Sequence, residues 1–244
     1  MNLRFLAYFD VLGYEVRITK KTLEEELALH KDMLERIQIS QDWATKGLDY
    51  SLISNVYFSD SFIFYSKDNS DKSFASIIAV ALFFMNVSAI KKLPYFPMRG
   101  AISYGDFLAD HKNKIYIGSA LREACRLQEK QDWMGCCLTE ACVQKVSDSR
   151  YFEKFKNEKT LLFYGVPMKP PNREEKLWCV NMESWPRNYA LKSKEMPITR
   201  DDFLRNIFEN RGINNLDSIK LNEDAERKLK NTQEFFCWVN QQAV

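Results

Sequence analysis

The sequence predicts a mixed α+β fold, in which a mostly antiparallel sheet carries packed helices and is followed by a C-terminal helical extension. The first observation is the mixed order of segments: strand, helices, hairpin, helix, two strands, helix and strand. The second is a pair of aromatic-rich segments around Asp60, which indicates an antiparallel hairpin. The third is composition: of 244 residues, 45% are hydrophobic and 14% are aromatic, which allows a sizeable core.

The first strand is expected at residues 3–10. Its middle, from Phe5 to Phe9, is a near-continuous apolar run, typical of a strand buried on both faces. Asp10 follows, and a carboxylate at this position is costly to bury unless it is paired or binds a cation. Gly13 then allows the backbone to turn and to approach a ligand closely. The alternative for Asp10 is an ordinary cap of the next helix.

A helical pattern covers residues 20–46, as one helix or two, and ends at Gly47. Two strands follow at residues 50–58 and 61–66, joined by a short turn that contains Asp60. Acidic residues at two central strand ends are the minimum needed to hold a pair of divalent ions. The alternative for Asp60 is a simple hairpin turn residue.

The segment 74–90 is almost wholly apolar and has two interpretations. It is slightly short for a bilayer and contains Ser76, Asn86 and Ser88. We therefore expect a helix at residues 73–92 that is buried against the sheet, and no membrane partner.

The remaining elements of the domain are shorter. In chain order, we expect a strand at residues 98–104 ended by Gly105, a polar loop at 106–114, a strand at 115–117, a helix from Gly118 to Gln131, a strand at 136–138, a helix at 140–146 capped by Thr139, and strands at 160–164 and 177–182. These elements complete a domain expected at residues 1–183.

Residues 184–244 are interpreted as a separate helical extension. The segment opens with Trp185-Pro186, continues through a polar stretch, and carries helical patterns at residues 200–210 and 224–240. We identify no chemistry in it and expect it to pack on the domain or on a partner.

Charge and composition argue against several classes of function. The chain has 35 basic and 33 acidic residues, a net charge of +2, which does not suit a nucleic-acid binder. Its two histidines, His30 and His111, argue against histidine-based catalysis or a histidine-rich metal site. Six cysteines without a CxxC pair, and no signal peptide, favour a reduced, cytoplasmic chain. The spacing of Cys136, Cys137 and Cys142 fits no zinc template, so buried thiols are expected there.

Four segments, taken in order, resemble the class III nucleotidyl cyclase family. FDVLGY at 9–14 resembles the first metal motif of the family, and YFSDSFIFYS at 57–66 resembles its hairpin with the second metal aspartate. MRGAISYG at 98–105 resembles the following strand, and IGSALREACRLQ at 117–128 resembles the helix that carries the transition-state arginine. The resemblance covers roughly residues 3–182 and implies a palm-type, ferredoxin-like catalytic domain.

This resemblance implies a cyclisation in which the 3′-hydroxyl of a nucleoside triphosphate attacks its own α-phosphate and expels pyrophosphate. Two Mg²⁺ or Mn²⁺ ions per site would be held by Asp10, Asp60 and the Val11 carbonyl, because these hard ions prefer carboxylate and carbonyl oxygens. If the next helix begins there, phosphate oxygens would be held by the N–H groups of three loop residues, Leu12, Gly13 and Tyr14.

Arg126 falls where the resemblance expects the arginine that stabilises charge at the α-phosphate. Arg122 stands where the family has a ribose-orienting asparagine. It lies one helical turn before Arg126, so the two side chains face the same way and are expected to share the binding of phosphate. The alternative is a solvated basic helix face. Arg99 and Lys169 are further candidates for triphosphate contacts, with a solvated surface position as the favoured alternative.

Base recognition depends on the strand before Asp60. Val56 stands where purine cyclases have a lysine, and the absence of this lysine favours a pyrimidine base. Tyr50 and Tyr57 lie on the same predicted strand and are candidates for contact with the smaller base, with core packing as the alternative. Ser59 replaces the glycine that the family usually places before its second aspartate.

The small, unadorned domain resembles the bacterial antiphage pyrimidine cyclases (uridylate and cytidylate cyclases) of Pycsar systems. The resemblance implies a phosphorus–oxygen lyase that converts UTP, or next CTP, into a cyclic messenger read by a separate effector protein. It also implies a homodimer, because the family builds its active site between two subunits. The alternatives are an adenylate or guanylate cyclase, a catalytically inactive dimerisation module, and a palm-type polymerase relative. The presence of both aspartates and the arginine argues against an inactive module, and the lack of extra domains or a basic groove argues against a polymerase.

Overall fold

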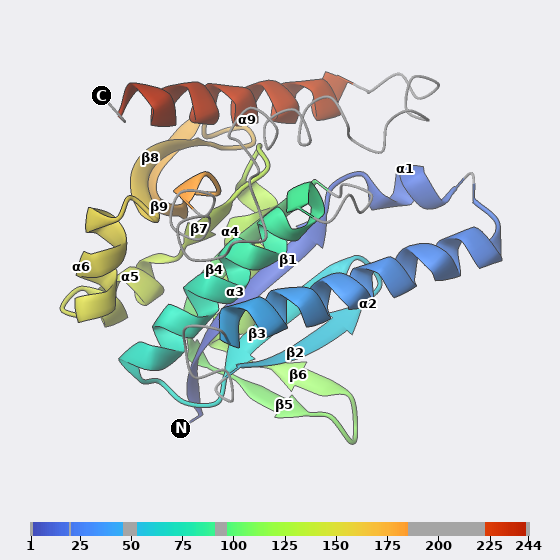
Figure 1. Cartoon of the computed structure of the whole chain (residues 1–244), viewed down its shortest axis with the longest axis horizontal. Helices are drawn as coiled ribbons and strands as arrows, with labels where there is room; N and C mark the ends of the chain where they lie inside the picture. The colour runs from blue at the N-terminus through green and yellow to red at the C-terminus, as the bar shows by residue number, and fades with distance from the viewer. Residues whose placement is uncertain (1, 20, 46–52, 91–96, 185–222, 243–244) are drawn as a thin grey trace.

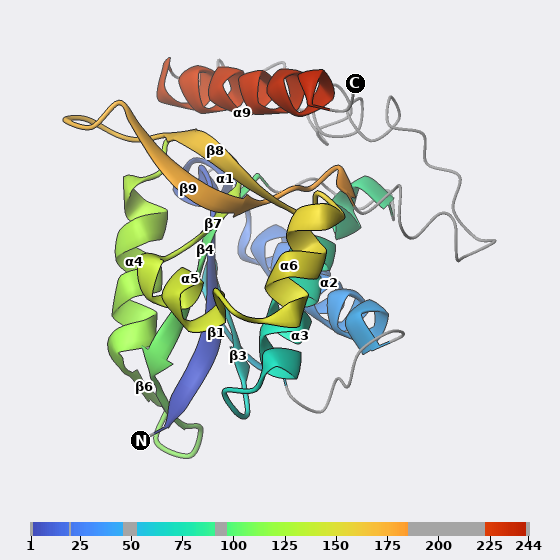
Figure 2. The same cartoon turned by 90° about the vertical axis from the view of Figure 1, so that its left-hand side faces the viewer.

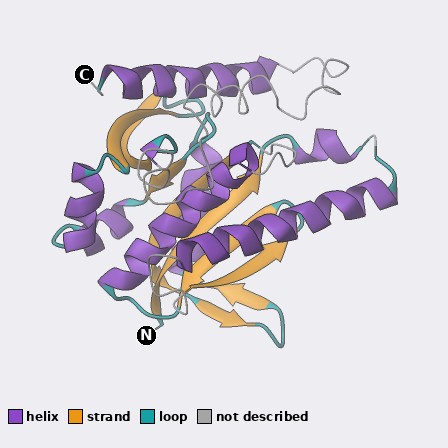
Figure 3. Cartoon of the chain, in the orientation of Figure 1, coloured by secondary structure: helices purple, strands orange, loops and turns teal. Residues whose placement is uncertain are grey.

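The computed structural model describes residues 2–19, 21–45, 53–90, 97–184 and 223–242. Its core is a seven-stranded sheet in the order β2-β3-β1-β4-β7-β9-β8. The strands are β1 (Leu3–Val11), β2 (Ile53–Phe58), β3 (Ser61–Ser66), β4 (Met98–Asp106), β7 (Cys136–Leu138), β8 (Leu161–Pro167) and β9 (Glu174–Val180). All neighbouring pairs are antiparallel except β4 with β7, so the predicted α+β fold with a mostly antiparallel sheet is confirmed (Figure 3).

Helices cover both faces of this sheet (Figure 2). The helices α2 (Leu23–Thr45) and α3 (Asp71–Ile90) lie on one face, and α4 (Ser119–Lys130) lies on the other. The shorter helices are α1 (Tyr14–Ile18), α5 (Glu140–Val146) and α6 (Arg150–Asn157). The sheet is therefore a middle layer, and its central strands are shielded from solvent on both sides.

The first strand, β1, lies between β3 and β4. Its side chains Phe5 and Phe9 belong to the larger apolar cluster on the α2 and α3 side, and Leu6 belongs to the smaller cluster on the α4 side. This two-sided burial confirms the interpretation of the apolar run. Because side chains alternate along a strand, Asp10 shares the α4 side with Leu6.

The apolar segment after the hairpin forms α3 and is buried against the sheet, as predicted. Its side chains from Phe74 to Met85 are buried almost throughout. The amide of Asn86 donates to the carbonyls of Leu82 and Met182 at 2.8 and 3.2 Å, so this buried polar group is satisfied. Within the described parts of the chain, no helix has the length and hydropathy needed to cross a lipid bilayer.

Two glycines shape the beginning of α4. Gly105 was expected to end the strand, but β4 continues through it to Asp106. A Cβ atom at residue 105 would lie 2.5 Å from the Oγ atom of Ser119, so Gly105 allows the helix to begin close against the strand. Gly118 precedes the helix with φ of 152°, and its missing side chain avoids the Asp106 carbonyl.

Two elements were not predicted. Residues 106–114, expected to be a polar loop, contain β5 (Leu108–Asp110), which pairs with β6 (Ile115–Ile117) in a separate two-stranded sheet. No side chain of β5 or β6 is fully buried, so β5 shows no apolar alternation in the sequence. The second is α6, a short helix whose N-cap residue Ser149 accepts a hydrogen bond from the Tyr151 amide through its hydroxyl.

The last helix, α9 (Glu223–Gln241), packs on the domain, which is one of the two placements that the sequence left open (Figure 1). Phe235 contacts the Trp133 ring edge-on at 4.9 Å and the Tyr164 ring at 4.9 Å. The contact joins α9 to β8 and to the segment after α4. The helical pattern at residues 200–210 lies outside the described residues.

Candidate active site

Asp10 and Asp60 lie on adjacent strand ends. Asp10 pairs in register with Ser61 of β3, the residue that follows Asp60. The amide of Val11 donates to the carbonyl of Asp60 at 3.1 Å. Pairing of β1 with β3 thus brings together two carboxylates that are far apart in the sequence.

Asp60 occupies the turn between β2 and β3 together with Ser59. Ser59 has φ of 56°, in the left-handed region that glycine adopts without strain. A glycine would suit this backbone, and Ser59 adopts the same conformation at a modest energetic cost.

The carboxylate of Asp10 is held through one oxygen. Its Oδ2 atom accepts a hydrogen bond from Gln128 Nε2 at 3.2 Å and lies 3.8 Å from Arg99 Nη2. Burial, followed by the charge of Asp60, raises the pKa of Asp10 to about 6, while Arg99, Gln128 and Lys169 act in the opposite direction. A partly buried carboxylate next to another acid is stabilised by a bound cation.

The donor set fits Mg²⁺ or Mn²⁺. In the part of the chain that the structure describes, no group of three or more His, Cys, Asp or Glu side chains could hold a metal. Mg²⁺, however, is usually bound by one or two carboxylates and completes its shell with water and substrate phosphates. Asp10, Asp60 and the Val11 carbonyl are therefore a sufficient set, and Oδ1 of Asp10 carries neither of the two contacts made by Oδ2.

The loop after β1 was expected to hold phosphate oxygens through its backbone. A helix does begin at Tyr14, although it is only five residues long. The amide of Leu12 donates to the carbonyl of Pro97 at 2.8 Å, so this N–H group is already paired. Gly13 has φ of 71°, and no heavy atom lies within 4 Å of the position of a Cβ atom, so the loop is open on that side.

Two tyrosines among the predicted substrate-binding residues, Tyr14 and Tyr57, meet at His30 of α2. Tyr57 points to the α2 side, where its hydroxyl is bonded to His30 and Met33 and its ring stacks on Phe62. Tyr14 is bonded to the same imidazole, with 2.7 Å between its hydroxyl and Nε2 of His30. These hydroxyls lie on the α2 side, and Asp10 faces the α4 side. The charge of Asp60, after burial, is among the causes that raise the pKa of both hydroxyls. Tyr14 was predicted to bind through its N–H group, and that prediction remains untested. Tyr50 lies outside the described residues.

The two arginines of α4 are exposed and share one side of the helix, as expected. The opposite side is buried and includes Ala124 and Gln128, which contacts Asp10. Because positions two residues apart differ by about 200° around a helix, Arg126 points away from the Asp10 that Gln128 touches. Arg122 does the same. The structure does not bring the arginines and the aspartates of one chain together.

A solvated surface position, the favoured alternative for Arg99, is wrong: its side chain is buried, with 6% of the residue exposed. Arg99 pairs in register with Asp10 across β4 and β1. Its Nη1 atom donates a hydrogen bond to the carbonyl of Gln131 at 2.7 Å. The pKa of Lys169 is lowered by burial and then by the charge of Arg99, so the two cations are close.

Gln128 was missed as a site residue. The available signal was its place on the amphipathic helix: Ala120, Ala124 and Gln128 recur at every turn, and all three are buried. A polar side chain at a buried helix position requires a partner. The sequence did not show which one, because Asp10 is distant along the chain.

No protein-family model matches the chain, and no curated protein matches it. Solved structures similar to it include two cyclase domains. One is the guanylate cyclase domain of RhGC from Catenaria anguillulae in complex with GTP, with 12% identity over 73% of this chain and 96% of that chain and a TM-score of 0.50. The other is the catalytic core of a rhodopsin-guanylyl cyclase with converted specificity in complex with ATPαS, with 12% identity over 74% of this chain and 95% of that chain and a TM-score of 0.53. The chain therefore has the α+β fold of the catalytic domain of class III adenylate and guanylate cyclases.

Proposed function

We propose that this chain is a nucleotidyl cyclase that converts a pyrimidine nucleoside triphosphate, UTP before CTP, into the 3′,5′-cyclic monophosphate and pyrophosphate. The observation that carries the proposal is the meeting of Asp10 and Asp60 on adjacent strand ends of a class III cyclase fold. In the reaction, the 3′-oxygen forms a bond to the α-phosphorus and loses its proton, and the bond from the α-phosphorus to the pyrophosphate oxygen breaks.

The residues of the chain have distinct roles in this proposal. Asp10, Asp60 and the Val11 carbonyl bind two divalent cations, either Mg²⁺ or Mn²⁺. When bound, such ions lower the pKa of the attacking hydroxyl and neutralise the leaving group. Gln128 and Arg99 orient Asp10 through its Oδ2 atom. This arrangement is pre-organised, since both partners are themselves buried.

The proposed enzyme is a homodimer with shared sites. Arg126 points away from its own Asp10, so a second copy of the chain must supply the arginine that stabilises charge on the α-phosphate. Phe58, which lies two residues before Asp60, is 78% exposed, as expected for a side chain that a second copy covers. Arg122, one turn before Arg126, would act on the same phosphates.

A pyrimidine base is favoured by Val56, whose side chain joins the apolar cluster on the α4 side instead of offering a charge. The second candidate function is a purine cyclase, because the two cyclase structures compared above were solved with GTP and ATPαS. The chain resembles the Pycsar cyclases in sequence. This resemblance implies that the cyclic product is a cytoplasmic signal in antiphage defence, read by a separate effector.

The decisive experiment incubates the purified chain with each of the four ribonucleoside triphosphates and Mn²⁺, and identifies the products by mass spectrometry. We expect cyclic UMP as the main product and cyclic CMP next. Cyclic AMP or cyclic GMP alone would establish the purine alternative. No cyclic product from any nucleotide, with a folded dimer, would contradict the proposed activity.

A further inference from the structure

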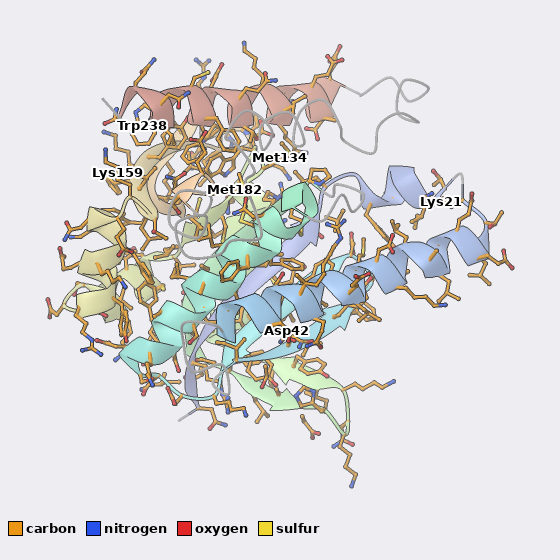
Figure 4. All side chains as sticks on the ribbon, in the orientation of Figure 1. Lys21, Asp42, Met134, Lys159, Met182 and Trp238 are labelled. Carbon is orange, nitrogen blue, oxygen red and sulfur yellow. The ribbon has the colours of Figure 1, made fainter. Side chains whose placement is uncertain are left out.

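The C-terminal helix α9 reaches the candidate site through one buried acid, Asp132. This residue is 3% exposed, and its carboxylate accepts hydrogen bonds from Nε and Nη2 of Arg227 at 2.5 and 3.0 Å. Its carbonyl accepts a bond from Asn231 at 2.6 Å. Two residues on, the amide of Met134, labelled below α9 in Figure 4, donates to the Thr232 hydroxyl at 2.9 Å. The helix is thus fixed to the segment that follows α4.

The same segment holds Arg99. The backbone carbonyl of Gln131 accepts a hydrogen bond from Nη1 of Arg99 at 2.7 Å. The side-chain amide of Gln131 donates a hydrogen bond to the Gly100 carbonyl at 2.9 Å. Nη2 of Arg99 lies 3.8 Å from Asp10. Asp10 and Asp132 are the two acids whose charges act most strongly on Arg99. The charges of the candidate metal ligand and of the acid that α9 binds therefore both act on this guanidinium.

Lys169 brings a second cation to this place. Its amide donates to the carbonyl of Lys130 at 2.7 Å, and the amide of Asp132 donates to the carbonyl of Pro167 at 2.9 Å. The end of β8 is therefore fixed to the same segment. The charges of Arg99 and Lys169 act on each other, and together they form the Arg99–Lys169 pair at the edge of the candidate site.

Arg227 binds Asp132 and Asp224, whose charges act on both members of this pair. Besides its two bonds to Asp132, its Nη2 atom pairs with Asp224, which also pairs with Lys228. If Arg227 were removed, Asp132 would be a buried carboxylate without a cation, which is strongly unfavourable. The charge of Asp132 acts on both Arg99 and Lys169, so the charge of these two cations would then be directed at Asp132.

We propose that Arg227 is a positioning residue: by neutralising Asp132 and Asp224, it leaves the Arg99–Lys169 pair available to bind the pyrophosphate portion of the substrate. This inference rests on the proposed function for the identity of its ligand. It gives α9 a role in the chemistry, which the sequence of the extension did not suggest.

The test depends on the sign of the charge that each variant leaves behind. Arg227→Gln leaves a negative charge next to the Arg99–Lys169 pair, and we expect it to weaken the binding of inorganic pyrophosphate with Mg²⁺ by about tenfold, as loss of an outer-shell partner does. Asp132→Asn breaks the same ion pair but leaves a positive charge, so the affinity should be kept or increased. The double variant should return to the wild-type affinity. Titration calorimetry on the full chain measures all three.

Two controls separate this role from a structural one. Lys230→Gln removes an exposed ion pair with Glu234 on the same helix and should change nothing. Melting temperatures identify any variant that fails to fold, and Arg227→Lys, which keeps the charge, should retain most of the affinity. Equal weakening by Arg227→Gln and Asp132→Asn would overturn the inference, as would the absence of pyrophosphate binding by the wild type. If the expected pattern appears in a chain that forms no cyclic nucleotide, the inference stands and the proposed function fails.

Discussion

Asp10 is surrounded by groups that act on its charge in opposite directions. Burial and Asp60 favour the neutral acid, whereas Arg99, Gln128 and Lys169 favour the carboxylate. The sequence predicted that this acid needs a partner, because it ends a buried strand. It also predicted Asp60 as the second acid. It did not reveal Gln128 or the burial of Arg99, because both depend on pairings between distant segments.

Asp60→Asn should abolish cyclic nucleotide formation, by at least about a hundredfold, while the chain stays folded. The amide keeps the size of the side chain but loses the charge that holds a divalent ion. Product formation measured by mass spectrometry and the melting temperature together check this outcome. Asp148→Asn, an exposed acid beyond α5, is the matched control and should be fully active. Unchanged turnover by the Asp60 variant would remove this residue from the metal site.

Without divalent ions, Asp10→Asn should be more stable than the wild type at about pH 8, by about 2–3 kcal/mol. The folded chain raises the pKa of Asp10 from 3.8 to about 6, so it binds more protons than the unfolded chain between these values. Wild-type stability therefore falls as the pH rises through this interval, and the difference between the proteins should vanish below about pH 4.

Thermal unfolding in EDTA across this pH range measures the effect. Addition of Mn²⁺ at about pH 8 should stabilise the wild type and not the variant, because the ion relieves the repulsion only where both carboxylates remain. Equal melting temperatures in EDTA at about pH 8 would be inconsistent with a raised pKa at Asp10.

At the scale of elements, local pattern was enough for most of the sheet and for α2, α3 and α4. The hairpin around Asp60 was predictable because aromatic-rich strands flank a short turn. The strand at residues 115–117 was predicted, but its partner β5 was not, because no side chain of this hairpin is fully buried. The end of β4 was placed too early, because Gly105 indicates a break by its type but serves a close contact with α4.

Gly100→Ala should destabilise the chain by about 1–3 kcal/mol and reduce turnover. Gly100 faces Phe9 across β1 and β4, and a Cβ atom would lie 2.3 Å from the Phe9 ring and 2.9 Å from the Tyr8 carbonyl. The strands would have to separate close to Asp10. Gly105→Ala is the comparison, because its closest contact is the rotatable hydroxyl of Ser119. Calorimetric melting should show the larger loss at Gly100; equal stability of the two variants would contradict this account.

For the whole molecule, one chain holds the aspartates and the arginine on separate surfaces. The exposed side of α4 carries Arg122 and Arg126, and its buried side carries the partner of Asp10. The sequence could not show this separation, since it depends on the direction in which α4 crosses the sheet. The proposed site therefore requires two copies of the chain, which makes subunit mixing the sharpest test of the proposed assembly.

Arg126→Ala and Asp60→Asn should each be inactive alone and should recover activity when the two are mixed. In a mixed dimer, one site has both Asp60 and Arg126 and the other has neither. Half of the randomly exchanged dimers are mixed, and each has one of two sites intact, so recovery should approach about a quarter of wild-type turnover. Mixing Arg126→Ala with the double variant is the control and should give no recovery, because no site in it is complete. If exchange is shown by mass spectrometry and the first mixture stays inactive, the sites do not lie between subunits, and α4 must turn Arg126 toward its own Asp10 in some other state of the chain.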